Sequence, residues 1–276
     1  HTLLIDPCSV ENKITPNTRA IIAVDYAGHP CQYSHLEQLA SKYDILLLSD
    51  ACHALGAEYH GRKVGSVAQM TAFSFHPVKH ITTGEGGMIT TEDESYADKL
   101  RVFRNHGIHS DFKTREKQGT WFYEMTDLGF NYRLSDIQCA LGASQIKKLP
   151  EWLKRRNKIA DVYSKEFEGL EGIVPLSCDD HVKNAYHLYV VKIKQKNQVN
   201  RKIVFERLKK AGISTNVHYI PVYWHPYYQK LGYQKNICPV AEKAYEQILS
   251  LPIFPGLKKA QLQTVISVLK DIFIGK

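Results

Sequence analysis

Residues 20–50, AIIAVDYAGHPCQYSHLEQLASKYDILLLSD, decide the fold class of this chain. Ala20–Val24 is a short run rich in β-branched residues, and Ile45–Leu48 is a continuous apolar run bounded by polar residues. Such runs are typical of strands that are buried on both faces. Between them a helical pattern begins at about Ser34, a good N-cap residue. Strand–helix–strand alternation predicts a parallel sheet, and therefore an α/β fold.

The pattern continues beyond this stretch. Thr71–Phe75 and Met88–Thr91 are two more predicted strands, which flank a polar loop containing glycine. The polar and aromatic residues 109–127 show no clear period, so we expect a long surface or interface loop there.

The second half has a different character, which predicts a large domain over residues 1–150 and a linking helix with a smaller α+β domain over 151–276. Two more helices are expected after residue 219. The other expected elements are helix Leu134–Leu149 closed by Pro150, helix Glu151–Glu168, strand Tyr186–Ile193, helix Arg201–Ala211 capped by Gly212, and strand Ser214–Tyr219.

The composition is that of an ordinary soluble protein, with 43% hydrophobic and 23% charged residues. No apolar run approaches the roughly 18 residues of a membrane span, and the start does not resemble a signal peptide. The six cysteines are scattered without a CxxC pair, which argues against a zinc or other metal site and favours reduced thiols in the cytoplasm.

The formal charge of +8 raises the question of nucleic-acid binding. The basic residues are spread along the chain, and the small clusters Lys147-Lys148 and Lys154-Arg155-Arg156 are predicted to be solvated helix faces. We therefore expect no nucleic-acid partner. A diffuse positive field suits a phosphorylated cofactor and an anionic, nucleotide-linked substrate.

Two residues carry the first chemical signal. Asp50 follows a predicted buried strand, where ligands of open α/β sheets bind, although a strand-end Asp can equally cap a helix. Lys79 lies on a loop rich in Ser, Thr and Gly, where a desolvated lysine can form an imine and the loop amides and hydroxyls can hold a phosphate. The structural alternative is a surface loop whose glycines only turn the chain.

Several motifs, in chain order, resemble those of the DegT/DnrJ/EryC1/StrS sugar aminotransferases. Asp50–Ala57 (DACHALGA) is similar to the family's Asp-x-x-His/Gln-Ala-x-Gly-Ala signature, and Ser74–Gly87 (SFHPVKHITTGEGG) to its lysine loop. Gly129–Gly142 (GFNYRLSDIQCALG) resembles its Gly-x-Asn-x-Arg helix entry. The shorter matches are His187–Tyr189, Val217–Tyr219 and Leu249–Pro252. The resemblance runs from about Asp6 to the C-terminus. Within the family, Val24–Gly28, Ser74–Lys79 and Val217–Tyr219 look closest to the enzymes of the pseudaminic-acid pathway.

The resemblance implies a fold-type-I aminotransferase: a mostly parallel, seven-stranded central sheet with helices on both faces, a smaller C-terminal domain, and a homodimer. It implies pyridoxal 5′-phosphate (PLP) as cofactor, bound covalently by Lys79, with Asp50 opposite its ring nitrogen. His53 would lie near the cofactor's phenolic oxygen, and Ser74 would bind its phosphate. Asn131 would reach the phosphate of the cofactor that the partner subunit binds. The residues placed near the sugar nucleotide are Tyr132, Arg133, His218 and Tyr219.

The implied reaction moves an amino group from an amino acid, L-glutamate, to C4 of a UDP-linked 4-keto-6-deoxy-2-acetamido sugar. Other nucleotide keto sugars remain alternatives, as does an inactive or truncated PLP-binding paralogue. The family's dehydratase branch, in which histidine replaces the lysine, fits less well because Lys79 is present. Among single residues, His53 could be a buried, hydrogen-bonded histidine, Arg133 a surface residue, and His218 and Tyr219 core residues of a strand.

Members of the family carry about 100 residues before the point that matches His1. In the family this segment supplies a phosphate-binding loop, an aromatic residue stacked on the cofactor, and strands of the main sheet. The large domain is therefore expected to be incomplete at its N-terminus, and the 276-residue chain is expected to bind cofactor weakly.

Overall fold

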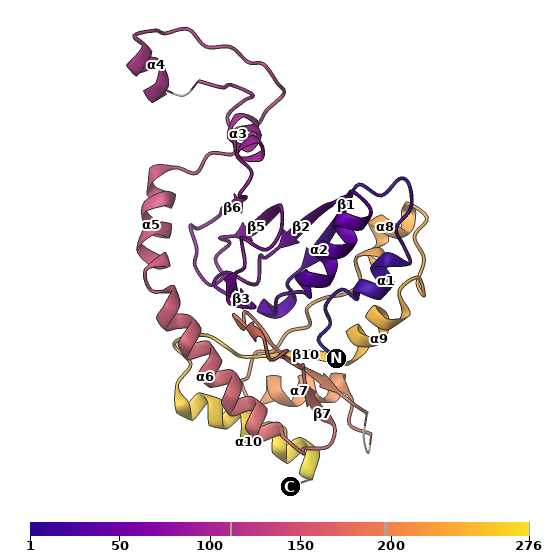
Figure 1. Ribbon diagram of the computed structural model, residues 1–276. Coiled ribbons are helices and arrows are strands. Elements are labelled where there is room, and N and C mark those ends of the chain that lie inside the picture. Colours follow the sequence, from indigo (N-terminus) through magenta and orange to yellow (C-terminus); the bar gives the residue numbers. More distant parts are fainter. Residues whose placement is uncertain (111, 196–197, 276) are drawn as a thin grey trace.

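The computed structural model describes residues 1–110, 112–195 and 198–275 (Figure 1). Its helices are α1 (Pro7–Glu11), η1 (Tyr26–Gly28), α2 (Tyr33–Lys42), α3 (Glu94–Phe103), α4 (Phe112–Gln118), α5 (Asp136–Ile146), α6 (Leu149–Phe167), α7 (Arg201–Lys210), η2 (Val222–Trp224), α8 (Pro226–Lys230), α9 (Pro239–Gln247) and α10 (Lys259–Ile274). Its strands are β1 (Ala20–Val24), β2 (Leu46–Asp50), β3 (Glu58–Tyr59), β4 (Arg62–Lys63), β5 (Met70–Ser74), β6 (Gly87–Thr90), β7 (Ile173–Pro175), β8 (Val182–Lys183), β9 (Tyr189–Ile193) and β10 (Ile248–Leu251).

The main sheet has the strand order β1-β2-β5-β6. β1, β2 and β5 are parallel, and β6 pairs antiparallel with β5. This arrangement confirms the predicted α/β class with a mostly parallel sheet. The register places Asp50 opposite Val24 of β1 and Ala72 of β5, so the carboxyl ends of three neighbouring strands lie together at one edge. That edge is where open α/β sheets bind ligands.

Helix α2 covers one face of this sheet, as Figure 1 shows. Leu36 and Leu39 of α2 pack against Ile21 and Leu47 of β1 and β2 in one buried cluster. On the opposite face, alternate residues of β1 are open: Ile22 is 60% exposed.

The start of α2 differs from the sequence prediction. The helix begins at Tyr33, with Gln32 in the N-cap position, and Ser34 is not the cap. The physical reason is the buried hydroxyl of Tyr33, which donates to the Asp25 carboxylate at 2.8 Å and so holds this residue inside the first turn.

The second half has a core of its own, built on the antiparallel sheet β10-β9-β7 and helices α6, α7 and α10. Helix α6 contributes to two cores. Leu149 belongs to a cluster with Phe73 and Phe75 of the main-sheet region, whereas Tyr163 and Phe167 belong to the second-half core. We propose that the two domains meet at this helix, near the predicted boundary at residue 150.

Three other predicted elements are corrected by the structure. Residues 214–219 do not form a strand, because Asn216 makes only an isolated bridge to Ser250 and the neighbouring backbone is held by side chains instead. Where the sequence predicts only a loop, residues 112–118 form helix α4, which Figure 1 shows on a segment that extends away from the sheet. The predicted helix Leu134–Leu149 is α5 followed by the start of α6. Pro150 lies in the first turn of α6, where its missing N–H is not needed.

Among the described helices, none combines the length and the apolar character that crossing a membrane requires.

Candidate active site

Lys79 lies on the hairpin loop that joins β5 to β6. The base of the loop is closed by backbone hydrogen bonds from Phe75 N to Gly86 O at 2.8 Å and from Thr83 N to Phe75 O at 3.1 Å. Phe75 and Ile81 anchor it on both sides of the lysine, since their side chains are only 7% and 3% exposed. The loop is therefore fixed by hydrogen bonds and buried side chains and is not merely a surface turn.

Helix α5 supports the loop from outside. The Gln145 side chain accepts a hydrogen bond from Thr82 N at 3.0 Å, and Gln138 Nε2 donates to Glu85 O at 3.0 Å. Gly142 permits this approach, because a Cβ there would lie 2.9 Å from Cγ2 of Thr83. The GFNYRLSDIQCALG motif thus fixes the lysine loop from its helical end.

Lys79 faces an open cavity of about 840 Å³. Its walls come from the lysine loop, residues 187–188, residues 214–219 and residues 250–254, and they include four predicted site residues: Ser74, Lys79, His218 and Tyr219. Burial lowers the pKa of Lys79, against the opposing influence of Cys52 and Asp50. A lowered pKa leaves more of the amine neutral and nucleophilic.

Asp50, the last residue of β2, and His53, in the turn that follows, are not among the residues that line the cavity, but both lie close enough to Lys79 for their charges to interact with it. The Asp50 carboxylate accepts a hydrogen bond from Cys52 N at 3.1 Å, which closes the turn toward His53. The ring centroid of His53 lies 6.3 Å from that of Tyr219 in the cavity wall. Burial, reinforced by the charge of Lys79, lowers the pKa of His53 to about 4, so its imidazole is neutral at physiological pH.

The structure argues against His53 as a merely satisfied core histidine. Its side chain is 9% exposed, and Nδ1 is buried without a hydrogen-bond partner in the part of the chain that the structure describes. A buried polar atom of this kind requires an explanation, and a ligand in the adjoining cavity supplies one.

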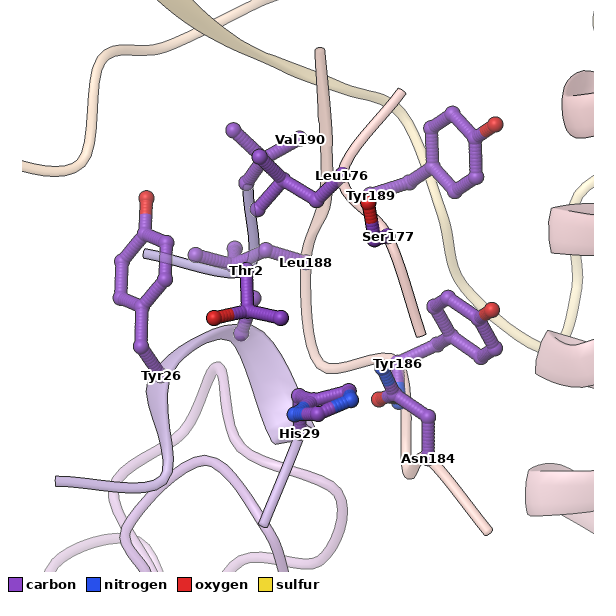
Figure 2. A pocket seen from close by; sticks show the side chains of 11 residues that line it. Thr2, Tyr26, His29, Leu176, Ser177, Asn184, Tyr186, Leu188, Tyr189 and Val190 are labelled. Atoms are coloured by element: carbon purple, nitrogen blue, oxygen red, sulfur yellow. Dashed lines mark hydrogen bonds between the residues drawn. The ribbon is translucent and has the colours of Figure 1, made fainter. Parts of the chain in front are cut away.

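The segment that carries His218 and Tyr219 is fastened from two sides. His218 Nδ1 is 2.8 Å from the Ser250 hydroxyl on β10, and the Tyr26 hydroxyl donates to the His218 carbonyl. Figure 2 shows Tyr26 and His29 near Asn184, Tyr186 and Leu188. These residues line a small cavity of about 20 Å³. The end of β1 therefore helps to place a segment far away in sequence.

Asn131, Tyr132 and Arg133 lie outside the cavity of this chain. All three are exposed. Asn131 bridges Asn105, and Arg133 donates to the Asn105 side chain at 2.8 Å. The segment that precedes Asn131 exposes large apolar side chains, such as Trp121 at 85% and Leu128 at 79%. The sequence prediction that Asn131 serves a partner's site stays a prediction.

Three residues around the site had no predicted role. Arg156, expected on a solvated face, is 6% exposed and donates to the carbonyls of Tyr186 and Ile253, both at 3.0 Å. Helical spacing could have placed it correctly, since Ile159, Ala160 and Tyr163 on the same face are buried. The sequence marks His187 only as part of a motif and gives no indication of a role for His80. Both are buried: His187 lies beside His53, and His80 lies beside His187.

Comparison with known proteins shows which family has this sequence and fold. Residues 1–270 match the model of the DegT/DnrJ/EryC1/StrS aminotransferase family. The chain belongs to this family. It is an aminotransferase, and the resemblance found in the motifs is confirmed.

Named relatives refine the comparison. The chain is 38% identical over 278 residues to a UDP-4-amino-4,6-dideoxy-N-acetyl-beta-L-altrosamine transaminase from Campylobacter jejuni, covering 98% of this chain and 72% of that one. The structure of the present chain is similar to that of Helicobacter pylori PseC, an aminotransferase of pseudaminic acid biosynthesis, with a TM-score of 0.89 and 35% identity. The match covers 99% of this chain and 71% of PseC. These relatives confirm the predicted likeness to the pseudaminic-acid branch.

The cofactor of the family is PLP. A PLP form of the putative sugar aminotransferase Spr1654 from Streptococcus pneumoniae matches with a TM-score of 0.89 and 31% identity, over 98% of this chain and 72% of that one. The residues present here fit the cofactor. They offer an amine of lowered pKa, a strand-end carboxylate, a hydroxyl at Ser74, and an imidazole with an unpartnered buried nitrogen.

Proposed function

We propose that this aminotransferase transfers the amino group of L-glutamate to C4 of a UDP-linked 4-keto-6-deoxy-2-acetamido sugar. The observation that carries the proposal is the cavity in which Lys79, His218 and Tyr219 lie together, in a chain that is similar to named transaminases of such UDP-sugars. The net charge of +8 favours a substrate that carries a diphosphate.

Lys79 and Asp50 would have different roles in the reaction. Lys79 Nζ would hold PLP covalently and, when released, move a proton at the amine-bearing carbon. Asp50 would hold the proton on the cofactor's ring nitrogen through its negative charge. When bound, PLP supplies the electron sink that such a reaction needs.

Two further residues would orient the cofactor. Neutral His53 can donate one hydrogen bond to the phenolic oxygen, since its lowered pKa leaves a single N–H on the ring. Ser74 lies at the end of β5, and its hydroxyl accepts a long hydrogen bond from His76 N, at 3.3 Å, with no other partner among the described residues. Its own O–H can therefore donate to the phosphate.

Substrate contacts are assigned to two regions. His218 and Tyr219 line the cavity and would meet the sugar from the same chain as Lys79. Asn131, Tyr132 and Arg133 are proposed to act on the site of a partner subunit, as the homodimer of the proposal requires. The three residues are exposed and do not line this chain's cavity, which supports that assignment. A cytoplasmic location belongs to the proposal as well, because all six cysteines are free thiols.

The test is a substrate panel. The protein would be given UDP-, dTDP- and GDP-linked 4-keto sugars with glutamate, and glutamine or alanine in parallel. We expect amination at C4 of the UDP-linked 2-acetamido sugar, with 2-oxoglutarate as coproduct. Preference for a GDP- or dTDP-linked sugar would overturn the substrate while leaving the aminotransferase intact. Cofactor binding without transfer to any sugar would favour an inactive paralogue.

A further inference from the structure

Three buried histidines form a chain of ring contacts at the Lys79 cavity, which His187 lines. The ring centroid of His187 is 4.4 Å from that of His53, with 36° between the ring planes, and 5.3 Å from that of His80. Their exposures are 7%, 9% and 5%. They come from three separate segments: the turn after β2, the loop after Lys79, and the chain leading into β9. Only the tertiary fold brings them together.

The cluster is not explained by stability. Among the described residues, the Nδ1 atoms of all three rings are buried without a partner. His80 Nε2 meets the Ala185 carbonyl at 3.0 Å, but the ring of His187 makes no side-chain hydrogen bond within the described ranges. A buried nitrogen that makes no hydrogen bond destabilises the fold. Among the described residues, the His187 ring therefore acts through its shape and its ring contacts, not through a hydrogen bond.

Backbone packing holds the two rings together. Gly28, which follows β1, has φ +102°, and a Cβ there would lie 2.9 Å from both His53 O and His187 N. Its carbonyl accepts a hydrogen bond from Ala185 N at 2.9 Å. On the other side, Arg156 donates to the His187 carbonyl at 3.3 Å. The His187 backbone is thus fixed from two directions, and its ring is fixed against His53.

The charges around the cluster keep the rings uncharged. Burial lowers the pKa of His187, and the neighbouring His53, His80, Lys79 and Arg156 lower it further. Two neutral rings attract one another without the repulsion that two imidazolium ions would suffer.

We propose that His187 is a positioning residue for the cofactor site, whose ring packs against His53 and holds that imidazole in the orientation that meets PLP. This inference rests on the proposed role of His53. It concerns a different residue, whose side chain has no assigned chemistry of its own.

The test uses a matched pair of variants. His187→Phe keeps a planar ring in the same place, and His187→Leu removes the ring while remaining apolar. We expect cofactor affinity close to that of the wild type for Phe and roughly three- to tenfold weaker for Leu, the range of a ring–ring contact. In a double-mutant cycle, adding His187→Leu to His53→Ala should weaken binding no further. The control is His60→Leu, because His60 stacks on His181 at 4.8 Å on the surface.

A second readout needs no cofactor. In nitrogen NMR spectra of the cofactor-free protein, the His53 ring should give one sharp set of signals in the wild type and in His187→Phe. It should give broadened or multiple signals in His187→Leu. Unchanged His53 signals in the Leu variant, or additive losses of affinity in the cycle, would overturn the proposal. If His53→Ala leaves cofactor affinity unchanged, the proposed role of His53 fails, and the NMR comparison alone decides whether His187 positions the ring.

Discussion

Replacing His80 by glutamine should remove a defined part of the acid sensitivity of this protein. His80 is 5% exposed, and burial lowers the pKa of its imidazole from 6.5 to about 3, with a smaller contribution from the charge of Arg156. Glutamine cannot titrate, but its side-chain N–H can still donate to the Ala185 carbonyl that His80 Nε2 meets at 3.0 Å. The substitution therefore separates ionisation from hydrogen bonding.

The sign and the size of the pH-dependent change in the free energy of unfolding follow from proton linkage. The unfolded chain binds a proton at His80 below its ordinary pKa of 6.5, whereas the folded chain does not until about pH 3. The contribution to stability is therefore fully present above 6.5 and is lost as the pH falls toward 3. Between about pH 7.5 and about pH 5, the loss amounts to about 2 kcal/mol. This figure depends mainly on the unfolded pKa, because at these pH values the folded imidazole stays neutral.

The assay is urea unfolding of the cofactor-free protein at the two pH values. The free energy of unfolding should fall by about 2 kcal/mol more in the wild type than in His80→Gln. Carboxylates titrate equally in both proteins and cancel in the comparison. The exposed His60→Gln should behave like the wild type. The reasoning is refuted if wild type and His80→Gln lose the same free energy, since His80 would then bind its proton equally well in the folded state.

Four shorter predictions concern the site. Lys79→Ala should abolish transamination, and borohydride reduction of the wild type should attach the cofactor to the Lys79 peptide; a label on another lysine would contradict the assignment. Asp50→Asn should retain cofactor but lower kcat by about two to four orders of magnitude, and near-normal turnover would reduce Asp50 to a strand-end cap. Mixing inactive Lys79→Ala and Asn131→Ala chains should restore partial activity, whereas no rescue despite subunit exchange would mean that one chain builds each site. Gly28→Ala should destabilise the fold by at least about 2 kcal/mol in urea unfolding, because its Cβ would lie 2.7 Å from Tyr186 N; a stable variant would show that this junction can relax.

Local sequence determined much of this protein. The apolar runs that became β1, β2 and β5 predicted the parallel sheet, because strands buried on both faces need unbroken apolar residues. The strand-end position of Asp50 and the Gly- and Thr-rich loop around Lys79 predicted a candidate site, because backbone geometry and imine chemistry restrict which residues can stand there. The motif order then identified the family.

Tertiary structure decided what depends on contacts distant in sequence. Ser214–Tyr219 is predicted as a strand, yet it is held by Ser250 and Tyr26 and forms no ladder. The sequence predicts Arg156 on a solvated helix face, but in the fold it donates hydrogen bonds to three carbonyls from two other segments. The contact of His187 with His53 has no sequence signal at all, because it joins residues more than a hundred positions apart through the absence of a side chain at Gly28. Periodicity reports which face of an element is buried, but only the fold determines what that face meets.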